Sequence, residues 1–253
     1  SYYDSGSTVS IFNSSPAGVP AALDPDTYTI VEKALEVSKA SNGAFDITIA
    51  PVEELWDFKS ESPVPPEQNL INENLKYVGY NNLILDSENK TLTKTIDGVK
   101  IDLGGCGKGY ACQKALEENY PDSYAILDFG GNVNVYGQNP KKINGSFTVG
   151  IQEPFAANGS YSEMVDITSG ESIVTSGTYQ RHFYYNNKNY HHILDPSTGT
   201  PFDSGFDSVS VISSSSLEAD CLSTACLVLG ETDGTKLANK FNAKTYWIKQ
   251  RSN

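Results

Sequence analysis

The sequence predicts an α+β fold of mixed, mostly antiparallel meandering strands packed with several helices. Short runs of β-branched and aromatic residues outnumber the runs with helical periodicity, which is the first reason for this class. The second is that successive strand signals are separated only by turn residues, as at Ser87-Glu88-Asn89 and Asp97-Gly98, which is typical of a meander. Because we find no internal repeat and no low-complexity linker, we expect a single domain over residues 1–253.

Composition narrows the classes of function. A length of 253 residues with 38% hydrophobic residues, 15 Tyr and 10 Phe is typical of a folded chain with a sizeable core. A net charge of −13 argues against a nucleic-acid partner, because neutralising phosphates requires clustered Lys and Arg. No apolar run approaches the length that spans a bilayer and no signal peptide is present, so a membrane tether, if any, lies outside this sequence.

The four cysteines form two close pairs, Cys106 with Cys112 and Cys221 with Cys226. Neither pair has CxxC spacing, and no Cys/His cluster of the zinc-binding type surrounds them. We therefore expect free, mostly buried thiols.

In the first hundred residues, the clearest element is a helix that starts with Asp24 as N-cap and Pro25 at the first position. Asn42-Gly43 provides its left-handed stop. We expect extended structure at residues 9–12, 44–51, 83–85, 91–93 and 99–103, a Pro-rich loop at 60–66, and a short helix at 69–78.

In the remaining chain, a helix at about 109–119 is followed mainly by strands. These are expected at residues 124–127, 133–136, 147–151, 164–167, 173–175, 181–185, 190–194, 208–212 and 245–248. Helices are expected at 217–229, which is strongly apolar, and at 235–241.

A glycine-rich turn, Gly104-Gly105-Cys106-Gly107-Lys108-Gly109, connects the expected strand at 99–103 to the following helix. Glycines let a backbone approach a ligand closely, and a helix N-terminus binds phosphate. The spacing matches neither a P-loop nor a dinucleotide-binding fingerprint. Phosphate binding and an ordinary tight connection both remain open on these residues alone.

Asp220 and Thr224 stand four residues apart in the apolar helix at 217–229, so they share one face. A carboxylate in apolar surroundings requires a compensating partner. A hard cation such as Mg²⁺ would suit a carboxylate with a hydroxyl one turn away. The alternative is that Asp220 bonds to a neighbouring backbone N–H or lysine.

Three further features are candidates for function. His192 lies where a strand breaks into a Gly/Pro loop, and it must face the opposite side from His191, although it could be an ordinary surface histidine. Thr175-Ser176-Gly177 could bond a ligand or form a simple Ser/Thr turn. Gly130-Gly131-Asn132 could let the backbone pass close to another element.

Taken in order, these motifs closely resemble the ApbE family of FAD:protein FMN transferases. The resemblance also includes Gly43-Ala44-Phe45-Asp46-Ile47 and Ser1-Tyr2-Tyr3-Asp4, so it covers essentially the whole chain. It implies an ApbE/T-fold-like flavin transferase fold and an extracytoplasmic location. Two departures are that a strand and a Met-Gly-Thr-like segment usual in the family are absent, and that Thr178 replaces a residue that is often acidic.

The resemblance also implies residue roles. His192 would be the catalytic base. The FAD contacts would be Tyr3, Ala44, Phe45, Asp46, Gly104, Lys108, Tyr110, Ser176 and Ile193, and Mg²⁺ would be held by Asp220, Thr224 and main-chain oxygens near Ser223 and Gly107. FAD would be the substrate, and the partner an acceptor protein with a Thr/Ser flavinylation motif.

The implied reaction is Mg²⁺-dependent transfer of FMN from FAD to a Thr or Ser hydroxyl, with release of AMP. Two alternatives stay open on the sequence. One is a Mg²⁺-dependent FAD pyrophosphatase that gives FMN and AMP with water as nucleophile. The other is a non-catalytic FAD-binding module.

Overall fold

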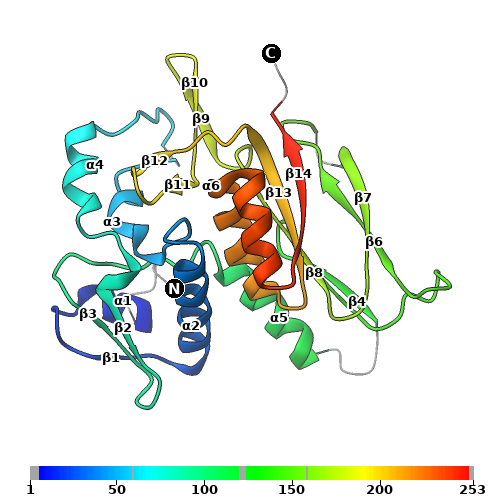
Figure 1. The fold of residues 1–253 in the computed structure, drawn as a ribbon, viewed down its shortest axis with the longest axis horizontal. Helices are drawn as coiled ribbons and strands as arrows, with labels where there is room; N and C mark the ends of the chain where they lie inside the picture. The colour runs from blue at the N-terminus through cyan, green and yellow to red at the C-terminus, as the bar shows by residue number, and fades with distance from the viewer. Residues whose placement is uncertain (1–5, 59, 120–123, 158, 251–253) are drawn as a thin grey trace. The chain divides into compact units, whose positions relative to one another are not determined.

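The computed structural model describes residues 6–58, 60–119, 124–157 and 159–250. The chain divides into two compact units (Figure 1). The first unit is Ser1–Gly105 with Gln180–Phe202, and the second is Cys106–Tyr179 with Asp203–Asn253. The expectation of one domain over residues 1–253 stays a prediction.

The first unit contains most of the short helices. They are α1 (Thr8–Ser14), α2 (Pro25–Ala40), η1 (Ile47–Ile49), α3 (Ala50–Glu53), α4 (Gln68–Leu75) and η2 (Tyr80–Asn82). Helix α2 confirms its predicted limits, because Asp24 Oδ1 accepts a hydrogen bond from the Thr27 N–H at 2.8 Å. At its other end, Asn42 and Gly43 adopt positive φ angles of 54° and 84°.

Two of the strands expected in the first unit are helical instead. Residues 9–12 belong to helix α1, because Ser7 caps it and the side chains of Val9 and Phe12, three positions apart, are buried on one face. Residues 47–51 form η1 and the start of α3 instead of a strand, and residues 44–46 are irregular, because the Asp46 side chain caps η1 and Pro51 suits the first turn of α3.

The meander in the first unit is a three-stranded antiparallel sheet of β1 (Ala21–Ala22), β3 (Thr91–Lys94) and β2 (Leu83–Asp86), in that order. The strand expected at residues 99–103 is not formed. The Asn13 side chain bonds to both backbone groups of Ile101, donating to its carbonyl at 3.0 Å and accepting from its N–H at 2.8 Å. A side chain thus takes the place of a neighbouring strand.

The last part of the first unit is the hairpin of β9 (His182–Tyr185) and β10 (Lys188–His191), followed by β11 (Leu194–Asp195) and β12 (Thr200–Pro201). The aromatic rings of Trp56, Phe58, Phe183 and Tyr190 pack together beside it. The Trp56 indole N–H also donates to the Gly199 carbonyl at 3.0 Å. These contacts anchor the loop that follows β10.

The second unit is built on a five-stranded antiparallel sheet of order β14-β13-β8-β5-β4. Its strands are β4 (Ala125–Asp128), β5 (Asn132–Tyr136), β8 (Ser172–Gly177), β13 (Phe206–Ser213) and β14 (Lys244–Lys249), and a separate ribbon is formed by β6 (Phe147–Gln152) and β7 (Tyr161–Ile167). Every pairing among the described strands is antiparallel, which confirms the predicted α+β class.

The two faces of this sheet are covered differently (Figure 1). The β6–β7 ribbon packs on one face over an apolar core that includes Val133, Ile173 and Ile212. Helices α5 (Gly107–Asn119) and α6 (Ser216–Lys240) pack on the other face. Because side chains alternate along a strand, Asn132 and Ser176 face the helices.

Helix α6 combines the two helices expected at 217–229 and 235–241. Gly230 lies between them with φ 76° and ψ 173°, outside the helical region, so the element is kinked there. The Gln113 side chain from α5 accepts hydrogen bonds from the Ser215 hydroxyl and the Ser216 N–H, both at 3.1 Å. The carboxamide of one helix therefore helps to cap the start of the other.

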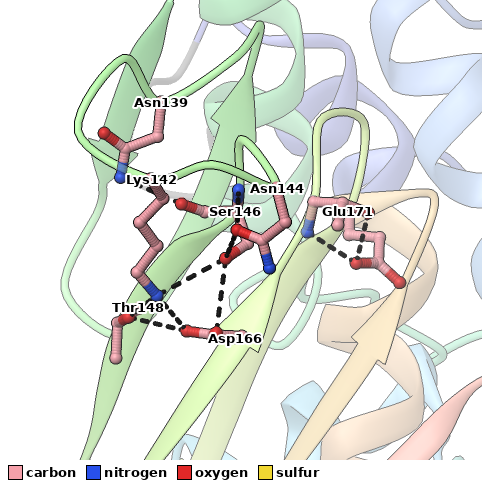
Figure 2. Close-up of polar contacts among 8 residues, drawn as sticks. Asn139, Lys142, Asn144, Ser146, Thr148, Asp166 and Glu171 are labelled. Atoms are coloured by element: carbon pink, nitrogen blue, oxygen red, sulfur yellow. Dashed lines mark hydrogen bonds and ion pairs between the residues drawn. The ribbon is translucent and has the colours of Figure 1, made fainter.

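A polar cluster fastens the loop before β6 to the outer side of the ribbon (Figure 2). Lys142 donates to Asp166 at 2.6 Å and also to the Thr148 hydroxyl. Asp166 in turn accepts from the Ser146 hydroxyl at 3.3 Å. Hydrogen bonds from these donors lower the pKa of the Asp166 carboxyl, so the cluster is charged at neutral pH.

All four cysteines are buried and free, as expected. Within the described part of the chain, none of the helices has the length and apolar character that crossing a membrane requires.

Candidate functional site

The site centres on the contact between α5 and α6 in the second unit. The backbone N–H of Gly109 donates to Asp220 Oδ2 at 2.8 Å. A Cβ at Gly109 would overlap the Ser216 carbonyl and lie 2.7 Å from Asp220 Cβ. Part of the glycine-rich turn therefore serves helix packing, a role that the sequence did not predict, and phosphate binding by the turn stays a prediction.

Asp220 is a buried carboxylate with only 3% of its surface exposed. Lys108 Nζ lies 3.8 Å from its Oδ1 atom. Burial raises the pKa of Asp220, while the Lys108 charge and the Gly109 N–H oppose that shift. Both partners expected for an Asp without a metal, a backbone N–H and a lysine, are thus present.

Hydroxyl groups extend the site along α6 and onto β8. Ser176 Oγ lies 2.8 Å from Ser223 Oγ and 3.3 Å from Thr224 Oγ1. Ser223 Oγ also donates to the Asp220 carbonyl at 3.0 Å. The structure thus brings together Asp220, Ser223, Thr224 and Ser176, four of the residues that the sequence singled out.

These groups suit only some metals. No cluster of three or more His, Cys, Asp or Glu side chains occurs among the described residues. A metal at this site would be held by one carboxylate, the Thr224 hydroxyl and main-chain oxygens. Such an all-oxygen set fits a hard cation that keeps several waters, and it does not fit zinc.

His192 lies in the first unit, directly after β10. Its backbone N–H donates to the Arg181 carbonyl at 3.0 Å, and its Nδ1 atom lies 3.3 Å from the same oxygen. Because a carbonyl can only accept, Nδ1 carries the proton and the lone pair of the neutral ring is on Nε2. His191 is buried, and its Nε2 atom lies 3.0 Å from the Phe202 carbonyl oxygen.

The other predicted flavin contacts fall in both units. Ala44, Phe45, Asp46, Gly104 and Ile193 are in the first, and Lys108, Tyr110 and Ser176 are in the second, while Tyr3 lies outside the described residues. Asp46 has a structural role in its own unit, accepting from the Thr48 N–H at 2.9 Å and the Tyr80 N–H at 2.7 Å. The assignment of these residues to flavin stays a prediction.

Sequence reasoning missed Asn132 as a site residue. It is 1% exposed and lies at the start of β5, where its Oδ1 accepts from Lys108 Nζ at 3.2 Å. The signal in the sequence is the Gly130-Gly131-Asn132 motif, although the motif alone predicts only a place where the backbone passes close to another element. Both glycines have positive φ, 67° and 91°, and form the turn that leads into β5.

Residues 1–247 match the model of the ApbE family. The chain belongs to the ApbE family. Among solved structures, the ApbE protein of Thermotoga maritima is similar to this chain. The TM-score is 0.86 and the identity is 33%, over 98% of this chain and 81% of that one.

Other ApbE-family relatives are similar over the whole chain. The flavin transferase ApbE of Vibrio cholerae is 27% identical with a TM-score of 0.85, over 100% of this chain and 80% of that one. The FAD:protein FMN transferase of Haemophilus influenzae is 30% identical over 100% of this chain and 75% of its own length. The FAD:protein FMN transferase of Escherichia coli K12 is 31% identical over 98% of this chain and 72% of its own length. These matches confirm the predicted family and its flavin transferase fold.

Proposed function

We propose that this chain transfers FMN from FAD to a Thr or Ser hydroxyl of a target protein and releases AMP, in a reaction that requires Mg²⁺. Membership of the ApbE family supports the transfer, because relatives are named FAD:protein FMN transferases. The observation that supports the metal requirement is the buried Asp220 carboxylate, held at the first turn of α5 and one helical turn from Thr224.

Asp220, Thr224 and the main-chain oxygens at Ser223 and Gly107 would hold Mg²⁺, which would supply positive charge for the diphosphate when bound. The chain's own groups add to this. The first N–H groups of α5 lie at a positive helix end, and Lys108 carries a mobile ammonium. For a protein of net charge −13, such local positive groups are needed to bind an anionic dinucleotide.

His192 would act as general base through Nε2, since its Nδ1 proton is directed to the Arg181 carbonyl. It would take the proton of the acceptor hydroxyl. The acceptor oxygen then bonds to the FMN phosphorus, and the bond from that phosphorus to the bridging oxygen breaks, so that AMP leaves with that oxygen. The product is FMN joined to the protein by a phosphoester, reached by positioning and charge stabilisation.

The test is to incubate the protein with FAD, Mg²⁺ and a Thr-containing acceptor peptide, and to follow AMP release and the peptide mass. We expect AMP and flavinylated peptide to appear together, only with metal and peptide present. Asp220→Asn should abolish both, whereas Glu231→Gln, which changes an exposed carboxylate on the same helix, should not. AMP release without peptide would indicate a pyrophosphatase, and intact bound FAD a binding module.

We also propose an extracytoplasmic location, which rests on the family resemblance alone. Fractionation of cells that express the natural gene, with a cytoplasmic marker protein as control, tests it.

A further inference from the structure

Three polar groups meet beside the first turn of α5. Lys108 Nζ lies 3.2 Å from Asn132 Oδ1 and 3.8 Å from Asp220 Oδ1. The two oxygens belong to side chains that are almost wholly buried, whereas the Lys108 side chain is 49% exposed. A flexible, solvent-accessible cation therefore covers a pair of fixed, buried oxygens.

The orientation of the Asn132 amide follows from its neighbour. An ammonium only donates, so the amide oxygen must face Lys108. The Asn132 NH₂ group is close enough to the Asp220 carboxylate to lower the pKa of Asp220, although Nδ2 makes no hydrogen bond of normal geometry with any described residue. A buried amide whose NH₂ group lacks a well-formed hydrogen bond is costly, and such groups in native proteins tend to serve a function.

The backbone holds Asn132 in this position. The Gly131 N–H donates to Asp128 Oδ1 at 3.0 Å in the turn before β5. The Asn132 carbonyl accepts from the Phe129 N–H at 3.0 Å. The turn and the sheet therefore fix the backbone from which the Asn132 amide oxygen reaches Lys108.

A carboxylate oxygen and an amide oxygen are both ligands that hard divalent cations prefer. Both oxygens carry lone pairs and lie within 3.8 Å of one ammonium, so a positive group at that point is favourable. Lys108 provides a single, monovalent charge there. Its side chain is long and half exposed, so it can leave without any change in the backbone.

We propose that Lys108 and a divalent cation compete for the same two oxygens, Asp220 Oδ1 and Asn132 Oδ1. Asn132 is thereby a further ligand of the metal site, and Lys108 is a built-in competitor that weakens metal binding in the free protein. When the metal binds, Lys108 is displaced and its ammonium becomes available to an anionic ligand such as a diphosphate. This inference rests on the metal requirement of the proposed function.

The experiment measures Mn²⁺ affinity of the purified protein without FAD, by electron paramagnetic resonance and calorimetry. We expect Lys108→Gln to bind Mn²⁺ roughly 1.5- to fivefold more tightly, the range appropriate to a half-exposed ion pair. Asn132→Leu should bind it more weakly, and Asn132→Asp more tightly. Lys114→Gln is the matched control, because it removes the same charge from the same helix at a residue that pairs with Glu118.

The outcomes separate the two proposals. Unchanged or weaker Mn²⁺ binding by Lys108→Gln, or an equal gain in Lys114→Gln, overturns the competition. If no variant binds Mn²⁺, both the competition and the metal requirement of the proposed function are overturned. A selective gain in Lys108→Gln supports the competition even if the protein fails to transfer FMN. Because Asn132→Leu could impair folding, Asn132→Asp and circular dichroism keep the role of Asn132 testable.

Discussion

Gly109 donates its backbone N–H to the Asp220 carboxylate at 2.8 Å, at a position where a methyl group would collide with α6. We expect Gly109→Ala to force the two helices apart and to lower the free energy of unfolding by about 1–3 kcal/mol, the usual cost of overpacking. Urea denaturation measures this. Gly107→Ala is the control, because a Cβ there would meet nothing within 4 Å. Equal stability of the two variants would contradict the packing role of Gly109.

His192 is expected to carry the proton transfer. His192→Ala should lower the rate of FMN transfer about 10²- to 10⁴-fold, the usual contribution of a general base, while Mn²⁺ affinity and thermal stability stay close to those of the parent. His182→Ala serves as control, since His182 is in the same hairpin and packs against Tyr184. A similar loss in both variants would mean that the hairpin was disturbed, and full activity of His192→Ala would exclude the base.

Ionisation of Asp24 should make the free energy of unfolding depend on pH in the acid range. Burial alone would raise the pKa of Asp24, but hydrogen bonds from Thr8 and Thr27 outweigh it and lower the pKa to about 2. The ionised carboxylate therefore stabilises the folded state above its ordinary pKa of 3.8, and this contribution is lost as the pH falls from there to about 2.

Two variants separate the cap from the charge at Asp24. Asp24→Asn should keep most of the cap at neutral pH but show a flatter dependence of stability between pH 4 and 2, whereas Asp24→Ala should lose about 1 kcal/mol at neutral pH. Urea unfolding at several pH values measures both. An unchanged acid slope in Asp24→Asn would show that the pH dependence comes from other carboxyl groups.

The cysteines should be unreactive in the native protein. Burial raises the pKa of Cys112 to about 11 and that of Cys226 to about 12, so almost no thiolate forms at pH 8. We expect no reaction with a disulfide reagent such as DTNB under native conditions, and four thiols to react in guanidinium chloride. Rapid labelling of the native protein would argue against the burial of these side chains.

Local signals explain where the sequence predicted the fold well. Helix α2 is defined by its own cap and stop residues, so no distant contact was needed to find it. The errors at residues 9–12, 44–51 and 99–103 have the opposite origin. Each run has apolar, β-branched residues typical of strands, but a capping Ser7 or Asp46, or the distant Asn13, decides its conformation.

In the candidate site too, the sequence predicted what depends on local spacing and missed what depends on distant contacts. Asp220 and Thr224 could be placed on one face because helical spacing is local. The role of Asn132 could not, because its approach to Lys108 depends on how β5 packs against α5. The same holds for Gly109, since the sequence could not tell whether its missing side chain left room for a ligand or for another helix.

The Gln113 carboxamide has a mechanical consequence. Since it bonds to the hydroxyl of Ser215 and the amide of Ser216 at the start of α6, the two helices are joined both there and at Gly109. Two points of attachment prevent one helix from sliding or rotating on the other. A ligand that pulls on the first turn of α5 would therefore move Asp220 with it. The two helices would shift together as one rigid body, so binding at that turn would also reposition any cation held by Asp220.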